Sequence, residues 1–175
     1  VEFSEETWAG NLSKVDQLKE IMVSIFLGNK SKNPKKSGID RGIVVIEPLE
    51  EQNRISEMRK SGLNIMMSMK SDAKPVSFVE DCAVPLPHLA DYTQGLTDIF
   101  KKYGTHGTWY AHASVGCLHV RPVLNMKNGS DVTKMRAIAL EAFELVKKFS
   151  GSHSGEHGDG ISRSEFNPVM FGEKL

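Results

Sequence analysis

The chain has 175 residues, with 22 Lys and Arg against 22 Asp and Glu, so its formal net charge is zero. A balanced charge provides no general attraction to nucleic acid or to anionic membranes, and a small molecule is the expected substrate. The length suits one hydrophobic core, and we predict that residues 1–175 form a single domain, a piece of a longer protein.

The sequence shows neither an export signal nor a long uncharged apolar run, which predicts a soluble cytoplasmic chain. Peripheral association with the inner membrane stays open for the longer parent protein. Two cysteines, Cys82 and Cys117, are too few for a disulfide framework, and we expect both thiols to be reduced.

Four segments carry apolar residues at helical spacing, and they predict amphipathic helices over residues 12–26, 49–62, 89–104 and 131–149. Ser13 followed by Asp16 resembles a capping box at the start of the first helix. Between the first two helices, the lysine-rich residues 29–41 favour a solvated loop.

Strands are predicted where β-branched and aromatic residues gather, over residues 43–46, 76–79, 107–113 and 118–124. Four residues separate the last two runs, which indicates a hairpin. Short strands that alternate with helices predict an α+β fold, with a mostly antiparallel sheet and helices packed on one face. Among such folds, a ferredoxin-like arrangement is the first choice.

Two stretches concentrate the chemistry: YAHASVGCLHVRP from Tyr110 and SGEHGDG from Ser154. Histidines seven apart in one strand face opposite sides, but a turn between them brings both to one side. Two imidazoles and one carboxylate suit zinc, manganese or iron(II). Our hypothesis is that the metal ligands are His112, His119 and Glu156, and that the base beside them is His157.

Arg121 follows His119 by two residues and should therefore face the same side of its strand. A guanidinium at that place suits a substrate carboxylate, which it can bind through two parallel hydrogen bonds. Cys117 lies between the two histidines, and it can be read either as a thiolate ligand or as a small buried residue.

Other functions fit the same residues. A metal-dependent hydrolase would use His157 or Glu156 to activate a metal-bound water. A non-haem iron oxygenase fits less well, because the close His-x-Asp/Glu pair is missing. A non-catalytic, ferredoxin-like binding or regulatory module would use its histidines for structure alone.

The two histidine stretches, together with RKSGLN, DAKPVSFVEDCAVPL and FGEKL, resemble the C-terminal, substrate-side domain of the FAD-linked D-2-hydroxy-acid dehydrogenases. This is the family of D-lactate dehydrogenase, glycolate oxidase and D-2-hydroxyglutarate dehydrogenase. The resemblance implies the same three metal ligands, with His157 as the base. It also implies that a carboxylate of a 2-hydroxy acid substrate is held by Arg59 and Lys74.

The resemblance further implies partners outside this sequence. FAD would be bound mainly by a preceding domain of the same parent chain. The form SVGCLH replaces the frequent GDGNLH of the family and resembles long versions that carry a further iron-sulfur domain or use an electron-transfer partner. The activity expected for the parent is oxidation of D-lactate or glycolate, with the flavin as hydride acceptor.

Overall fold

The computed structural model describes residues 2–27 and 43–172, which divide into two compact units, Val1–Lys60 and Ser61–Leu175. The single-domain expectation stays a prediction. The predicted loop over residues 29–41 lies outside the described residues. None of the described helices combines the length and apolar character that a membrane crossing requires.

The first unit contributes the helices α1 (Trp8–Leu27) and α2 (Leu49–Lys60), both expected from their apolar spacing. The capping box at Ser13 was wrong, because α1 begins five residues earlier and Ser13 lies inside it. The strand over residues 43–46 was also wrong: this segment is irregular, and the side chain of Val44 is 77% exposed. A β-branched run forms a strand only where a partner edge accepts its backbone hydrogen bonds, and the described part of this unit has no sheet.

The second unit begins with α3 (Gly62–Met67) and is built on one long strand, β4 (Cys117–Leu124). β3 (Gly107–His112) pairs antiparallel with one edge of β4, with η5 (Ala113–Val115) in the connection, so the predicted hairpin is confirmed. On the other edge lie two short antiparallel strands, β1 (Lys74–Pro75) and β2 (Cys82–Ala83). The strand expected over residues 76–79 was wrong: this segment is an irregular turn, and the strands β1 and β2 lie before and after it.

A single antiparallel bridge adds Ser152 beside Ala83, with backbone hydrogen bonds of 2.9 Å in both directions. The order across the sheet is therefore Ser152, β2, β4 and β3. Along the chain, strand, helix, hairpin, helix and final bridge follow one another as in the ferredoxin-like β-α-β-β-α-β pattern. The predicted α+β class is confirmed, with the fourth strand reduced to one residue pair.

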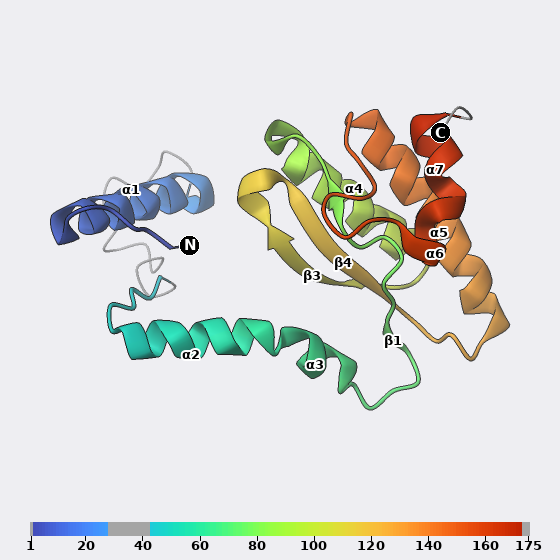
Figure 1. Ribbon diagram of the computed structural model, residues 1–175, viewed down its shortest axis with the longest axis horizontal. Helices are drawn as coiled ribbons and strands as arrows, with labels where there is room; N and C mark the ends of the chain where they lie inside the picture. The colour runs from blue at the N-terminus through green and yellow to red at the C-terminus, as the bar shows by residue number, and fades with distance from the viewer. Residues whose placement is uncertain (1, 28–42, 173–175) are drawn as a thin grey trace. The chain divides into compact units, whose positions relative to one another are not determined.

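Two helices cover one face of this sheet: α4 (Leu89–Lys102), which follows η4 (Leu86–His88), and α5 (Gly129–Lys148) (Figure 1). They pack against each other and against the inward residues of the sheet. The largest wholly buried side chains of this core come from the turn before β2, from β4 and from the two helices: Phe78, Tyr92, Leu96, Phe100, Leu124, Ile138 and Phe143. The core thus occupies one side of the sheet and leaves the other side for polar residues.

After Ser152 the chain crosses back over the sheet and ends in α6 (Gly160–Arg163), η6 (Ser164–Phe166) and α7 (Asn167–Phe171). Phe166 is buried against Phe143 of α5, with ring centroids 4.9 Å apart. This contact ties the C-terminal segment to the core, so the loop at residues 153–159 is held at both of its ends.

Candidate metal centre

The hairpin decides which side chains face away from the core. Directly opposed residues in an antiparallel pair share a face, and the register pairs His112 with Cys117 and Tyr110 with His119. The same rule places Arg121, opposite Thr108, on this face. The alternate residues, such as Leu118 and Val120, belong to the core.

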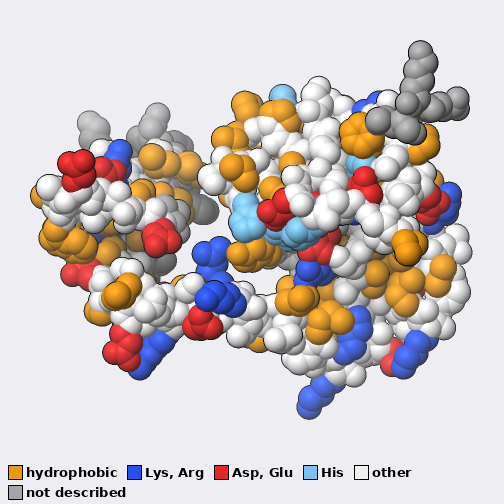
Figure 2. All heavy atoms as spheres, viewed as in Figure 1, with side chains coloured by type: hydrophobic (Ala, Val, Ile, Leu, Met, Phe, Trp, Pro, Cys, Tyr) orange, Lys and Arg blue, Asp and Glu red, His pale blue; other side chains and the backbone are white. Residues whose placement is uncertain are grey.

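Glu156 brings the histidines together. Its Oε1 atom lies 2.9 Å from Nε2 of His119, 3.5 Å from Nε2 of His112 and 3.4 Å from Nε2 of His157. The ring of His119 is stacked on that of His157, with centroids 4.9 Å apart. Figure 2 shows histidine side chains gathered beside acidic side chains on this face of the unit. The four residues predicted for metal and base therefore converge.

The spacing of these atoms can be compared with that of a metal site. Ligand atoms about 2.0–2.1 Å from a tetrahedral zinc ion lie roughly 3.3–3.5 Å from one another. The distances from Glu156 to His119 and to His112, 2.9 and 3.5 Å, are close to this value. Among the described residues, no group of three or more possible ligand atoms that includes one from His112 lies wholly within 4.8 Å. The half-exposed ring of His112 must therefore move closer to complete a metal-binding shell.

Two buried groups behind the histidines could also offer ligand atoms, Asp81 and Cys117, which together with His119 and Glu156 lie within 4.8 Å. The Asp81 carboxylate is already engaged, because it accepts the backbone N–H of Glu156 at 2.9 Å and that of His157 at 2.8 Å. Burial raises the pKa of the Cys117 thiol to about 11, and the thiol lies 3.6 Å from Oδ1 of Asp81. Cys117 thus fits the reading as a small buried residue better than the reading as a thiolate.

Hydrogen bonds keep Asp81 ionised. Burial by itself would raise the pKa of this carboxyl, but the backbone N–H groups of His157 and Glu156 outweigh it and hold the pKa below its ordinary value. Arg163 lies 3.5 Å from Oδ2 of Asp81 and also donates to the carbonyl of His153 at 2.9 Å. The charge of this buried carboxylate is therefore balanced within the fold.

Glu80 is the neighbour of His119 on its other side. Its Oε1 lies 3.8 Å from Nδ1 of His119, a buried nitrogen that has no hydrogen-bond partner. Arg121 binds both carboxylate oxygens of Glu80, through Nε at 3.1 Å and through a terminal nitrogen. A carboxylate at the outer nitrogen of a ligand histidine fixes the ring's orientation and tautomer. Glu80 is the carboxylate beside this nitrogen of His119, but at 3.8 Å the two groups are too far apart for a hydrogen bond.

Of the other predicted substrate residues, Lys74 lies away from the histidines. Lys74 donates to the carbonyls of Met67, at 3.2 Å, and Met69, at the end of α3. It pairs with Leu124, five residues beyond His119 along β4 and therefore about 16 Å away at the usual rise of a strand. Arg59 lies in α2 of the first unit, and its part in the site stays a prediction.

The sequence reading missed Glu80 and Asp81. A signal was present, since two carboxylates interrupt the otherwise apolar run SFVEDCAVPL. Acidic residues are almost never fully buried unless they are paired, and both are buried here, at 8% and 0% exposure. Acidic residues within an apolar run of a sequence are therefore candidates for residues that support a functional site.

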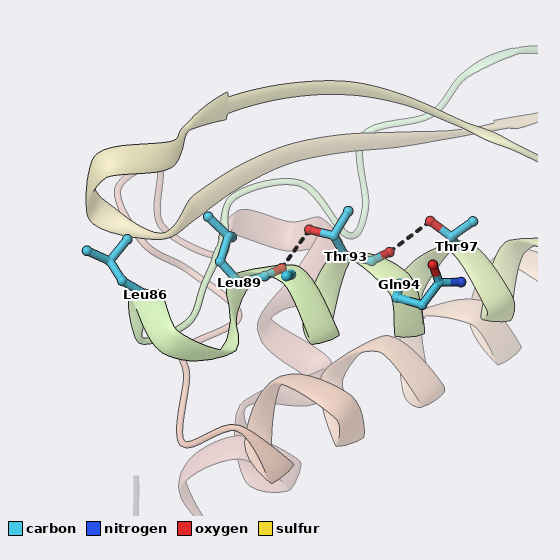
Figure 3. A pocket seen from close by; sticks show the side chains of 6 residues that line it. Leu86, Leu89, Thr93, Gln94 and Thr97 are labelled. Carbon is cyan, nitrogen blue, oxygen red and sulfur yellow. Dashed lines mark hydrogen bonds between the residues drawn. The ribbon is translucent and has the colours of Figure 1, made fainter. Parts of the chain in front are cut away.

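A shallow hollow along α4, lined by Leu86, Leu89 and Thr93 among others, lies on the helical layer and not at the histidines (Figure 3). The hydroxyls of Thr93 and Thr97 are engaged with backbone carbonyls of the helix, at 2.7 and 2.8 Å. The hollow therefore offers few polar groups to a ligand and is separate from the candidate metal centre.

Comparison with known proteins shows the family of the chain. The family model described as FAD linked oxidases, C-terminal domain, matches residues 13–175. The chain belongs to this family. It is 37% identical over 134 residues to D-2-hydroxyglutarate dehydrogenase of Pantoea ananatis and likewise 37% identical to that of Escherichia coli, in each case over 77% of this chain. It is 26% identical over 131 residues, 75% of this chain, to glycolate oxidase subunit GlcD of Bacillus subtilis.

The family resemblance inferred from the two histidine stretches is thus confirmed. The aligned part of the chain spans only 13% of the length of the two dehydrogenases and 27% of the glycolate oxidase subunit. What this domain contributes to a complete protein is therefore a matter for proposal.

Gly116 fixes the turn that brings the two histidines together, and this leads to a testable prediction. Its φ is +72°, and a Cβ there would lie 2.0 Å from the carbonyl oxygen of Val84. Gly116→Ala is expected to lower the free energy of unfolding, measured in urea, by more than about 1–3 kcal/mol, the usual cost of left-handed backbone alone.

Gly104→Ala is the matched control for this prediction. Its φ is +68°, but nothing lies within 4 Å of a Cβ built there, so it carries the backbone cost without the clash. Equal losses in the two variants would contradict a steric requirement at Gly116.

Proposed function

We propose that this chain is the substrate- and metal-binding domain of an FAD-dependent D-2-hydroxy-acid dehydrogenase, of the D-lactate or glycolate type. The observation that carries the proposal is the convergence of three imidazole nitrogens within 3.5 Å of one Glu156 oxygen. Membership of the FAD linked oxidase family supports a flavin as redox partner, supplied by another domain of the parent chain. The metal in this proposal is zinc or manganese.

The roles of the residues follow from their exposure and contacts. His119 is nearly buried and fixed by its neighbours, as suits a ligand, whereas the side chains of His112, Glu156 and His157 are 43%, 45% and 51% exposed. The open side of the site is therefore where a small hydroxy acid would bind. A divalent ion bound there would lower the pKa of the substrate hydroxyl as a Lewis acid.

In this reaction His157 would accept the proton of the hydroxyl, and the flavin of the parent chain would supply the acceptor for the hydride from C2, which gives the 2-oxo acid. Arg121 lies on the same face and would orient the substrate carboxylate, sharing its charge with Glu80. Lys74 and Arg59 stay proposed carboxylate ligands on the family resemblance alone.

The proposal is tested in the full-length protein by anaerobic reduction of its flavin with D-lactate, glycolate, D-2-hydroxyglutarate and L-lactate. We expect reduction by at least one of the first three, none by L-lactate, loss with a chelator and recovery with zinc or manganese. Hydrolysis catalysed by the chain without flavin would favour a metal-dependent hydrolase instead.

His157→Ala tests the role of the base. Removing a general base costs about 10²–10⁴-fold in rate, so we expect flavin reduction to slow by at least about 100-fold while the metal content stays unchanged. His106→Ala, at an exposed histidine ahead of β3, is the control and should keep full activity. Retained reduction in His157→Ala would remove this residue from the mechanism.

A further inference from the structure

The loop that carries Glu156 and His157 has no secondary structure of its own. After the bridge at Ser152, residues 153–159 form bends and irregular backbone up to the start of α6. A segment without a helical or strand hydrogen-bond ladder takes its position from other contacts. The source of those contacts decides how precisely the carboxylate and the imidazole are placed.

One residue, Asp81, supplies those of the part that carries Glu156 and His157. Besides accepting the N–H groups of Glu156 and His157, the Asp81 carboxylate accepts the hydroxyl of Ser154 at 3.2 Å. The backbone carbonyl of Asp81 accepts the N–H of Gly155 at 2.7 Å. Four consecutive residues, from Ser154 to His157, are thus bound to this single acidic residue.

Asp81 is itself fixed to the strand that carries the other half of the site. Its N–H donates to the carbonyl of Leu118 at 3.0 Å, next to His119, and its side chain is wholly buried. Its φ is +76°, a left-handed backbone that Asp and Asn adopt more readily than other side chains. Asp81 therefore connects the backbone beside His119 in β4 with the loop through consecutive hydrogen bonds.

We propose that Asp81 is a positioning residue of the metal centre, which sets the places of Glu156 and His157 relative to His119 through their backbone N–H groups. The proposal rests on the proposed function for its effect on metal binding. It explains why a negative side chain is buried behind a site whose own carboxylate, Glu156, is half exposed. A carboxylate accepts two converging N–H groups, whereas an amide would offer an NH₂ donor to one of them.

Asp81→Asn is the sharpest variant, because Asn keeps the shape and tolerates the left-handed backbone. In the full-length protein we expect the Kd for zinc or manganese, measured by calorimetry, to rise about 10–100-fold, the usual range for an outer-shell partner of a metal site. A Kd within about twofold of the wild type would overturn the proposal.

Asp131→Asn is the matched control. Asp131 also accepts a backbone N–H, that of Asn125 at 2.9 Å, but at the start of α5. It should lower the melting temperature without changing the Kd. If Asp131→Asn weakened metal binding as strongly as Asp81→Asn, the effect would reflect general stability, and the positioning role would be rejected.

Gly155→Ala perturbs the same junction from the loop and covers the case in which Asp81→Asn fails to fold. A Cβ at Gly155 would lie 3.1 Å from the backbone oxygen of Asp81 and 3.3 Å from its Oδ1. The added methyl crowds the contact without removing the carboxylate, so a smaller rise in Kd is expected. An unchanged Kd here, in a folded variant, would contradict the proposal.

Amide hydrogen exchange separates this proposal from the proposed function, since it needs no metal. The N–H groups of Glu156 and His157 should be protected in the wild type and should lose at least about tenfold protection in Asp81→Asn. If the wild type bound no metal, the proposed function would fail, and loss of protection would still support the positioning role. Retained protection would overturn it.

Discussion

His119→Ala is expected to weaken binding of zinc or manganese to the chain by more than about 100-fold. Of the three imidazoles, that of His119 lies nearest to Glu156, at 2.9 Å. Two groups of described side chains are close enough to hold an ion, and His119 belongs to both: Asp81, Cys117, His119 and Glu156 form one, and Glu80, His119 and His157 form the other. Loss even of an outer-shell partner costs about 10–100-fold in metal affinity, so loss of a ligand should cost at least as much. Calorimetric titration of the purified chain measures the effect.

The control for this variant is His106→Ala. His106 is exposed and lies just ahead of β3, at the end of the hairpin away from the turn, so its loss should leave metal affinity unchanged. Circular dichroism checks that both variants keep their helices. Metal binding that survives in a folded His119→Ala chain would contradict the assignment of this ligand.

Phe143→Ala should be among the most destabilising substitutions. The side chain is wholly buried, and its ring lies 4.9 Å from that of Phe166 and 5.0 Å from that of His153. Replacing a buried Phe by Ala costs about 3–5 kcal/mol through lost burial and the cavity left behind. Urea unfolding followed by circular dichroism gives the free energy of unfolding directly.

This substitution should also affect the site, because His153 and Phe166 hold the two ends of the segment that contains Glu156. Ile161→Ala is a suitable control: Ile161 lies in the same segment but is 98% exposed, so the change should stay within about 0.5 kcal/mol. A loss below about 1 kcal/mol for Phe143→Ala would show that this contact does not fasten the C-terminal segment.

Local patterns in the sequence were sufficient for the four long helices and the hairpin, but not for the short helices α3, α6 and α7. The apolar spacing in residues 89–104 and 131–149 corresponds to α4 and α5, because an amphipathic helix shows its buried face within a few turns. The strand predicted at residues 43–46 was wrong because a strand, unlike a helix, needs a partner, and a β-branched composition does not show whether a partner strand exists.

The sequence by itself was enough to recognise the family, through two short stretches whose residue types and glycines are specific, and it predicted the kinds of metal ligand. Only the tertiary structure decided that His119 and Glu156, 37 positions apart, meet at 2.9 Å, that Arg121 is paired with Glu80, and that Asp81 holds the loop. The physical reason is that the periodic spacing of apolar residues within a short segment indicates a helix or a strand. A loop without periodicity takes its place from hydrogen bonds to residues far away in the chain.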